Sequence, residues 1–393
     1  PLLFPWYYAA SMHEVPVMMQ TADIGGPILV SIVILAVNVA VAELLEKPVF
    51  GLQLDRRIAI AGAVIPALAL GYGAWRMSSI DARVAEAEPL KVGMVQGNSP
   101  LMRRSRALEV HFELTKKLRE QNVDLVVWSE AAASRSFLTT NYESHAKEVI
   151  SKHLGGPAII GGVLFERLPA EGGRKPRSRL YNSALIANAE GDIGGRYDKQ
   201  FLLMFGEYLP FSDTFPQLHD ISPNSGHFTP GTSFDPLRFE KDGKTHELAT
   251  MICYEDIIPS FVNKLVDAGD PELLVNMTND AWFGDTAEPW QHLALAQFRS
   301  IEHRLYMVRV TNSGVTAIID PVGRTPVVSE TFKQQALTGE VRFLKIDTLY
   351  SQIHDIPWWI VAALLALMCV VKRPDRKLRP TRPRRRTGPS AHA

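Results

Sequence analysis

Three apolar stretches constrain this chain more than any other feature of its sequence. Each approaches the length that crosses a lipid bilayer, which takes about 20 residues of α-helix. They cover residues 24–45, 58–75 and 357–371. The third is short, but it extends back to His354 through two tryptophans suited to a membrane interface. We therefore predict transmembrane helices at about 24–45, 58–75 and 354–371; the alternative for each stretch is a buried helix of a soluble core.

The distribution of Lys and Arg predicts which parts of the chain face the cytoplasm. The formal net charge is zero, yet the tail 372–393 is rich in Arg, and the short loop 46–57 carries Lys47, Arg56 and Arg57. Positively charged segments next to spans remain in the cytoplasm. We therefore expect a basic cytoplasmic tail, and a region between the second and third spans on the periplasmic side of a bacterial inner membrane. A basic run of this kind is usually a solvated tail, so no nucleic-acid partner is predicted.

The remaining sequence divides into a membrane region, a linker and one large polar domain. The membrane region is 1–80, the linker is 81–90 and the domain is 91–345. In the domain, β-rich runs alternate with helical patterns and hairpins, and the Pro-, Gly- and Ser-rich stretch 212–237 is predicted to be a functional loop. Strands are predicted at 91–97, 123–130, 157–165, 248–255 and 273–280, hairpins at 181–199 and 306–324, and helices at 103–120, 143–153, 257–267 and 289–303. This alternation predicts an α/β fold in which helices cover the faces of sheets.

The cysteine at position 253 lies where an apolar strand gives way to acidic residues. It ends the run LATMIC, and Tyr254, Glu255 and Asp256 follow it before a predicted helix. A helix N-terminus favours thiolate over thiol, and the turn would lift the sulfur out of the sheet. Cys253 is therefore a candidate nucleophile, although a buried cysteine is also a common apolar filler. The other cysteine, Cys369, lies inside an apolar run, so no disulfide is predicted.

Two further segments of the same domain place ionisable groups at the ends of apolar runs. Glu130 ends VVWSE, and Lys199 opens the segment KQFLLMFGEYLPF, which carries Glu207. Singly, each is more often an ordinary surface charge at a strand end. Together with Cys253 they supply what acyl transfer by a cysteine requires, namely a carboxylate that takes the thiol proton and an ammonium group that stabilises an oxyanion.

The ordered set Glu130, Lys199 and Cys253 resembles the Glu-Lys-Cys triad of the nitrilase (carbon–nitrogen hydrolase) superfamily. The resemblance covers about residues 90–345. Several motifs make the chain similar to the apolipoprotein N-acyltransferase family, and they read VQGNSP, WSEAA, YDKQFLLMFGEYLPF, CYED, NMTNDAWFG and RVTNSGVTAIIDPVGR. The resemblance implies a four-layer α-β-β-α sandwich on a membrane bundle, with no metal or organic cofactor.

The resemblance also implies a reaction and roles for the matching residues. Cys253 would accept a fatty acyl chain from a phospholipid as a thioester and pass it to the α-amino group of the N-terminal diacylglyceryl-cysteine of an apolipoprotein. Glu130 would be the general base, and Lys199 would help to stabilise the oxyanion. Supporting and substrate-binding roles would fall to Glu207, Tyr254, Glu255 and Trp282. The implied partners are the phospholipid donor, the apolipoprotein acceptor and the membrane.

The chain departs from the family pattern in two ways. The family commonly has Pro before the base and Thr or Ser after it, whereas Ser129 and Ala131 flank Glu130 here, which leaves the local backbone geometry open. The family has eight spans, whereas this sequence shows three, which fit the last two before the catalytic domain and the one after it. Because the sequence opens on Pro1 rather than Met, we expect an N-terminally truncated membrane bundle.

Two other functions remain open on the sequence. The triad is also consistent with a membrane-tethered amidohydrolase of the nitrilase type, which uses water as the acceptor. A non-catalytic binding domain on a membrane stalk is a third hypothesis, and it predicts that Cys253 is dispensable. His292 and His303 share a predicted helix, but their spacing brings in no third ligand, so they are interpreted as ordinary helix residues and no metal site is predicted.

Overall fold

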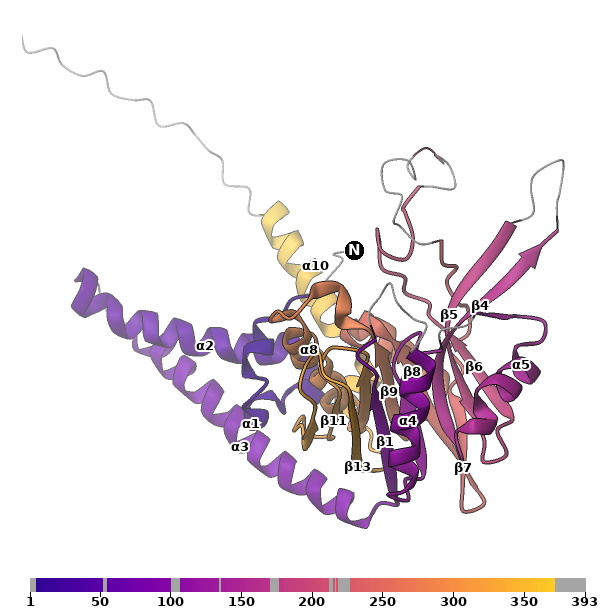
Figure 1. Ribbon diagram of the computed structural model, residues 1–393. Coiled ribbons are helices and arrows are strands. Elements are labelled where there is room, and N and C mark those ends of the chain that lie inside the picture. Colours follow the sequence, from indigo (N-terminus) through magenta and orange to yellow (C-terminus); the bar gives the residue numbers. More distant parts are fainter. Residues whose placement is uncertain are drawn as a thin grey trace, which may run out of the picture. The chain divides into compact units, whose positions relative to one another are not determined.

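Figure 1 shows the computed structural model of the chain. The chain forms two compact units, residues 1–354 and 355–393. The described residues are 5–51, 55–99, 107–133, 136–169, 177–211, 215, 217 and 227–371. The basic tail 372–393 and half of the predicted loop 212–237 lie outside them.

Two long apolar helices precede the sheets of the first unit. A 3-10 turn η1 (Tyr8–Met12) and a short helix α1 (Pro16–Met19) lead into α2 (Ala22–Phe50) and α3 (Arg56–Glu86). By length and composition, Ala22–Leu45 and Arg56–Glu86 are long and apolar enough to cross a membrane. The predicted helices at 24–45 and 58–75 are therefore present, with longer bounds.

Helix α3 extends into the predicted linker at 81–90. It continues to Glu86, and the first strand begins at Pro89. Ile80 is fully buried, and Val84 packs against the main core of the domain. These apolar positions recur at helical spacing between charged residues, so the end of α3 is held by packing on the sheets rather than left as a polar connection.

Two mixed sheets form the body of the unit, in the strand orders β13-β1-β2-β4-β5-β6, with β3 paired to β4, and β12-β11-β10-β9-β8-β7. The first contains β1 (Pro89–Gln96), β2 (Leu125–Trp128), β3 (Ser136–Leu138), β4 (Ala158–Leu168), β5 (Arg177–Ala187), β6 (Ile193–Asp198) and β13 (Gln335–Arg342). The second contains β7 (Leu237–Lys241), β8 (Lys244–Ile252), β9 (Leu273–Thr278), β10 (Met307–Thr311), β11 (Ala317–Ile319) and β12 (Val327–Val328). Central pairs such as β1–β2 and β8–β9 are parallel, so their carboxyl ends gather at one edge of each sheet.

Helices cover the sheets, and the main apolar core lies between the sheets. The helices are α4 (Ala107–Arg119), α5 (Tyr142–Val149), α7 (Pro259–Ala268) and α8 (Glu288–His303), with the 3-10 turns η2 (Ser151–His153), η3 (Cys253–Ile257) and η4 (Asp280–Phe283). One buried cluster joins β1 to β8, β9 and β10 across the two sheets, and a second joins the first sheet to α4 and α5. The prediction of an α/β sandwich is confirmed.

The predicted elements are present, but several ends differ. Both hairpins occur, as the antiparallel pairs β5–β6 and β10–β11. The strand predicted at 248–255 stops at Ile252, because the chain turns sharply at Cys253. The helix predicted at 103–120 is described from Ala107 onward.

The second unit contains a single described helix, α10 (Ile356–Val371). It is apolar along its length, and Trp359 is among its exposed side chains. The segment Ile356–Cys369 is shorter than the two N-terminal candidates for membrane spans. The predicted helix at 354–371 is present, and it begins two residues later than predicted.

Candidate active site

Cys253 occupies a strained turn at the carboxyl end of β8. It is the first residue of η3, its φ is +57°, and its side chain is partly exposed. A non-glycine residue in this region costs about 1–3 kcal/mol and persists where neighbouring contacts fix it. One such contact is from Asn276 on β9, whose Nδ2 donates to the Cys253 carbonyl at 2.9 Å. The turn brings the side chain out of the sheet, as the sequence predicts.

The prediction of a thiolate stabilised by a helix N-terminus is wrong for the resting site. Cys253 starts a 3-10 turn of five residues, and the α-helix α7 begins only at Pro259. Burial raises the pKa of the Cys253 thiol, and the opposing charge of Lys199 does not cancel that rise. The raised pKa favours the protonated thiol at neutral pH, so any attack by this sulfur would require a base.

Glu130 follows the carboxyl end of β2 in a turn that presses against β4. The next residue, Ala131, has a φ of +49°, so the backbone adopts a left-handed turn without the Thr or Ser of the family pattern. Gly161 of β4 lies directly against this turn, and a Cβ there would collide with the Ser129 carbonyl oxygen and lie 2.8 Å from the Ala131 nitrogen. The glycine thus permits the close backbone approach that positions Glu130.

Lys199 and two glutamates form a buried group at the end of β6. The Lys199 side chain is 1% exposed, and its Nζ lies 2.8 Å from Glu207 Oε2 and 3.4 Å from Glu130 Oε1. Asn182 of β5 donates from Nδ2 to Glu130 at 2.7 Å and to Glu207 at 3.1 Å. The Leu203 N–H donates to Glu207 Oε2 at 2.8 Å. The structure therefore brings together three predicted residues that are as much as 77 positions apart in sequence, Glu130 and Glu207.

The charges of this group favour an ammonium ion and a basic carboxylate. Burial raises the pKa of Glu130, Lys199 opposes the rise, and Glu207 adds to it. For Lys199, burial favours the neutral amine, but Cys253, Glu130 and Glu207 outweigh burial and hold its pKa well above the usual value. Lys199 is therefore a permanent cation, and Glu130 is a stronger base than an exposed glutamate.

Glu255, which was predicted to have a supporting or substrate-binding role, is fully buried. Its carboxylate accepts from the backbone N–H groups of Gln200, Phe201 and Ile252 at 2.7, 2.9 and 2.7 Å, and from the Tyr197 hydroxyl at 2.9 Å. It therefore ties the loop after Lys199 to the end of the strand before the cysteine.

Tyr254 and Trp282, the other two residues with predicted supporting or substrate-binding roles, lie on the different turns η3 and η4. Tyr254 is 5% exposed, its hydroxyl donates to the Leu202 carbonyl at 3.0 Å, and its ring centroid lies 5.8 Å from Lys199 Nζ. Tyr254 thus forms a wall of the lysine site. Trp282 lies on η4 and is 66% exposed, so it is available to a large apolar ligand.

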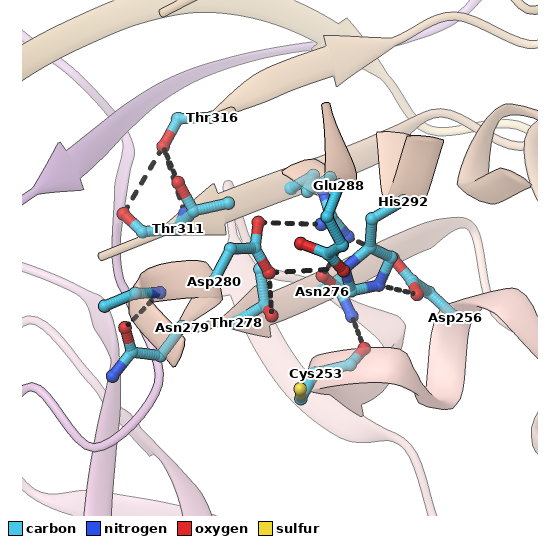
Figure 2. A network of polar contacts seen from close by, with 12 residues as sticks. Cys253, Asp256, Asn276, Thr278, Asn279, Asp280, Glu288, His292, Thr311 and Thr316 are labelled. Atoms are coloured by element: carbon cyan, nitrogen blue, oxygen red, sulfur yellow. Dashed lines mark hydrogen bonds and ion pairs between the residues drawn. The ribbon is translucent and has the colours of Figure 1, made fainter. Parts of the chain in front are cut away.

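A second polar group, behind the cysteine, was not anticipated from the sequence (Figure 2). His292 Nε2 lies 2.9 Å from Asp256, and His292 Nδ1 lies 3.2 Å from Asp280. Arg309 binds both aspartates and also donates to Asn276 at 2.9 Å. The sequence did carry a signal, because Asn276 and Arg309 interrupt the strands LLVNMT and MVRVT, where buried polar residues need partners.

Part of this group has the spacing of a metal site. Asp280, Glu288 and His292 each place one ligand atom within 4.8 Å of the others. The spacing argument from the sequence considered histidines alone and missed these carboxylates. Arg309 already supplies positive charge to Asp280, and both nitrogens of His292 face carboxylates, so the protein itself balances the anions here.

The chain has relatives among known proteins. The sequence model of the carbon-nitrogen hydrolase family matches residues 91–349. The chain is 29% identical over 382 residues to the apolipoprotein N-acyltransferase of Geobacter metallireducens, a match that covers 94% of this chain and 70% of that protein. It is 32% identical over 390 residues to the apolipoprotein N-acyltransferase of Pseudomonas aeruginosa, a match that covers 96% of this chain and 70% of that protein. Among solved structures, a mutant amidase from Nesterenkonia sp. with a covalent acetamide moiety at its active-site cysteine has a TM-score of 0.46 and 16% identity, covering 70% of this chain and 97% of that one.

Proposed function

This chain belongs to the carbon-nitrogen hydrolase family and, within it, to the apolipoprotein N-acyltransferases, and we propose that Cys253 transfers a fatty acyl chain from a phospholipid to the N-terminal diacylglyceryl-cysteine of an apolipoprotein. The observation that carries the mechanism is the buried ammonium of Lys199 between Glu130 and Glu207, close enough to the thiol for its charge to act on the thiol pKa. In this proposal, Glu130 is the general base, Lys199 is the fixed cation and Cys253 is the nucleophile.

The first half-reaction forms a thioester. Glu130 takes the proton of the Cys253 thiol, and the sulfur attacks the carbonyl carbon of a phospholipid ester. Lys199 stabilises the negative charge that develops on the carbonyl oxygen. The ester C–O bond then breaks, Glu130 returns its proton to the leaving alkoxide, and lysophospholipid departs while the acyl chain stays on sulfur.

The second half-reaction forms an amide. The uncharged α-amino group of the acceptor attacks the thioester carbonyl, and Glu130 takes the proton that nitrogen loses. The C–S bond breaks, and Glu130 returns the proton to the sulfur. The cysteine thiol is restored, and the acceptor carries one more acyl chain. Glu207 and Asn182 keep Glu130 and Lys199 in place through both steps.

We place the site above the outer surface of a bacterial inner membrane. Arg56 and Arg57 are exposed at the start of α3, which favours a cytoplasmic position for that end. If α3 crosses the membrane, its C-terminal end lies on the periplasmic side, together with β1 and the domain that follows. Both substrates are anchored in lipid, so a site at the headgroup level reaches them without extracting them.

Exposed aromatic side chains near the site support access for an acyl chain. Phe205 and Phe211 are 61% and 76% exposed, and they lie on the segment that carries Glu207. Trp282, on the turn that follows β9, is 66% exposed. Large exposed apolar groups near a reactive centre are typical of contact with lipid or with an apolar ligand.

The test is acyl-enzyme formation on the purified chain in phospholipid vesicles. Intact-mass spectrometry should detect a gain of one acyl group that hydroxylamine removes, and a diacylglyceryl-cysteine peptide should become N-acylated. Cys253→Ala should abolish both signals. Cys369→Ala is the matched control and should retain both.

Two results would contradict the proposal. Release of ammonia or free acid from short amides, without lipopeptide acylation, would identify a nitrilase-type amidohydrolase. Full complementation of a depletion strain by Cys253→Ala would indicate a binding domain that needs no nucleophile.

A further inference from the structure

Four charged side chains form a buried cluster behind the nucleophile, here called the aspartate–histidine cluster (Figure 2). Its members are Asp256, Asp280, His292 and Arg309, and each is at most 2% exposed. Ionised groups of this kind are costly to bury unless each is paired. Even when paired, such groups often stabilise a fold less than apolar residues of the same volume would, so stability alone does not account for the cluster.

The cluster reaches the cysteine turn by two routes. Asp256 lies three residues after Cys253 in the same 3-10 turn. Asn276 forms the second route, since its Nδ2 donates to the Cys253 carbonyl and its Oδ1 accepts from Arg309, each at 2.9 Å. The strained φ of Cys253 is thus supported from the cluster.

The cluster also reaches the turn that carries Trp282. Asp280 is the first residue of that turn, η4, and Thr278 donates to its carboxylate at 3.1 Å. Gly314 leaves the space for this carboxylate, because a Cβ there would collide with it. The position of Asp280 is therefore fixed by sterics as well as by charge.

His292 bridges the two turns. Its Nε2 lies 2.9 Å from Asp256, and its Nδ1 lies 3.2 Å from Asp280. Neutral imidazole has one N–H and can donate to only one carboxylate, whereas imidazolium donates to both. The geometry therefore matches a protonated ring, and it gives the cluster two cations for two anions.

The local charges agree with this protonation state. Burial and Arg309 both oppose a charge on His292, but Asp256 and Asp280 outweigh them and raise its pKa to about 9. Glu288 also faces the ring, 3.9 Å from Nδ1, and burial together with Asp280 raises the Glu288 pKa to about 7.

We propose that His292 is a positioning residue for acyl transfer, a protonated bridge that fixes the turn of Cys253 relative to the turn of Trp282. This inference rests on the proposed function, since it concerns the same reacting sulfur. The hydrogen-bond partners of His292 are Asp256 and Asp280, so it acts through these carboxylates and, by way of Arg309, through Asn276. Loss of its charge leaves one anion unbalanced and releases the two turns from each other.

The test compares His292→Gln with His303→Gln in the whole chain. His303 is the matched control because it is buried on the same helix, burial lowers its pKa to about 3, and its ring nitrogens have no hydrogen-bond partner among the described residues. Thioester formation on Cys253 is followed in phosphatidylethanolamine–phosphatidylglycerol vesicles. His292→Gln should slow it about 100-fold, as expected when a reacting group moves by about 1 Å. His303→Gln should leave the rate near that of the wild type.

The pH profile separates positioning from a general loss of folding. The wild-type rate should fall as pH rises through about 9, where His292 loses its proton. In His292→Gln that alkaline limb should vanish. The charge-balanced double variant His292→Gln/Asp280→Asn should recover at least about 10-fold over the single variant, because interacting sites are non-additive.

The inference is overturned if His292→Gln acylates at the wild-type rate, if it keeps the alkaline limb, or if the double variant is slower than the single one. If His292→Gln does not fold, the alkaline limb of the wild-type protein and the rate of the double variant test the inference. A wild-type protein that forms no thioester would instead contradict the proposed function.

Discussion

At the scale of single residues, the proposed chemistry depends on the affinity of the Glu130 carboxylate for the thiol proton of Cys253. In the proposed mechanism, Glu130 needs a pKa high enough to take the thiol proton and low enough to be ionised at neutral pH. Burial and Glu207 raise that pKa, whereas Lys199 and the hydrogen bond from Asn182 lower it. Asn182 is the adjustable member of this set, since it contacts both carboxylates and carries no charge.

Replacing Asn182 should therefore shift the pH dependence of acylation. Its hydrogen bond stabilises ionised Glu130, so Asn182→Ala raises the pKa of Glu130 further. The acidic limb of thioester formation should move up by about one pH unit, since a hydrogen bond to a charged group is worth about 1.5–3 kcal/mol. Rates between pH 5 and pH 9 measure the shift. Asn188→Ala, in the turn of the same hairpin, should leave the limb in place.

At the scale of elements, the approach of β4 to the Glu130 turn decides where the base lies. Gly161 and Gly162 are neighbours on this strand, but they have different surroundings. A Cβ at Gly161 would collide with the Ser129 backbone, whereas one at Gly162 would lie 3.6 Å from the Phe137 ring, an ordinary contact. The strand thus has one position that must be glycine beside one that need not be.

The two glycines make a matched pair of variants. Gly161→Ala forces backbone apart, so it should lower the free energy of unfolding by about 1–3 kcal/mol. It should also slow thioester formation about 100-fold by displacing Glu130. Gly162→Ala should change either quantity far less. Equal effects of the two substitutions on acylation would contradict this account of the turn.

At the scale of the whole molecule, one carboxylate joins the apolar helices to the catalytic domain. Asp23, at the start of α2, is 2% exposed and binds three groups. Tyr72 and Arg76 of α3 donate to it at 2.7 Å, and so does Arg304, the C-cap residue that follows α8. Asp23 thus connects α2 and α3 to the sandwich at the C-terminal end of α8, the helix that carries His292.

Asp23→Asn should loosen this junction. It leaves the buried guanidinium of Arg304 without its counter-ion, a change that costs about 3–5 kcal/mol. Thermal unfolding in detergent, followed by tryptophan fluorescence, measures the loss. Asp81→Asn is the control, because its pair with Arg324 has side chains that are 46% and 42% exposed. An exposed pair contributes about 1 kcal/mol or less. Similar losses in the two variants would argue against a buried clamp.

Local features of the sequence determined much of this protein. The apolar stretches predict α2 and α3, because their length and composition match those of helices that can cross a membrane. Alternating β-rich and helical runs predict the α/β sandwich, because helix and strand patterns depend on neighbours along the chain. The meeting of Glu130, Lys199 and Glu207 was expected only from the family resemblance, because these residues are far apart in sequence.

The tertiary structure decided what depends on distant partners. Burial, which no local pattern reports, keeps the Cys253 thiol protonated and encloses Glu255 among four donors. Asn182, His292 and Arg309 gain their roles from residues that are 12 to 53 positions away in sequence. Electrostatic and steric interactions act through space, so the charge state and fixed geometry of the site exist only once the chain has folded.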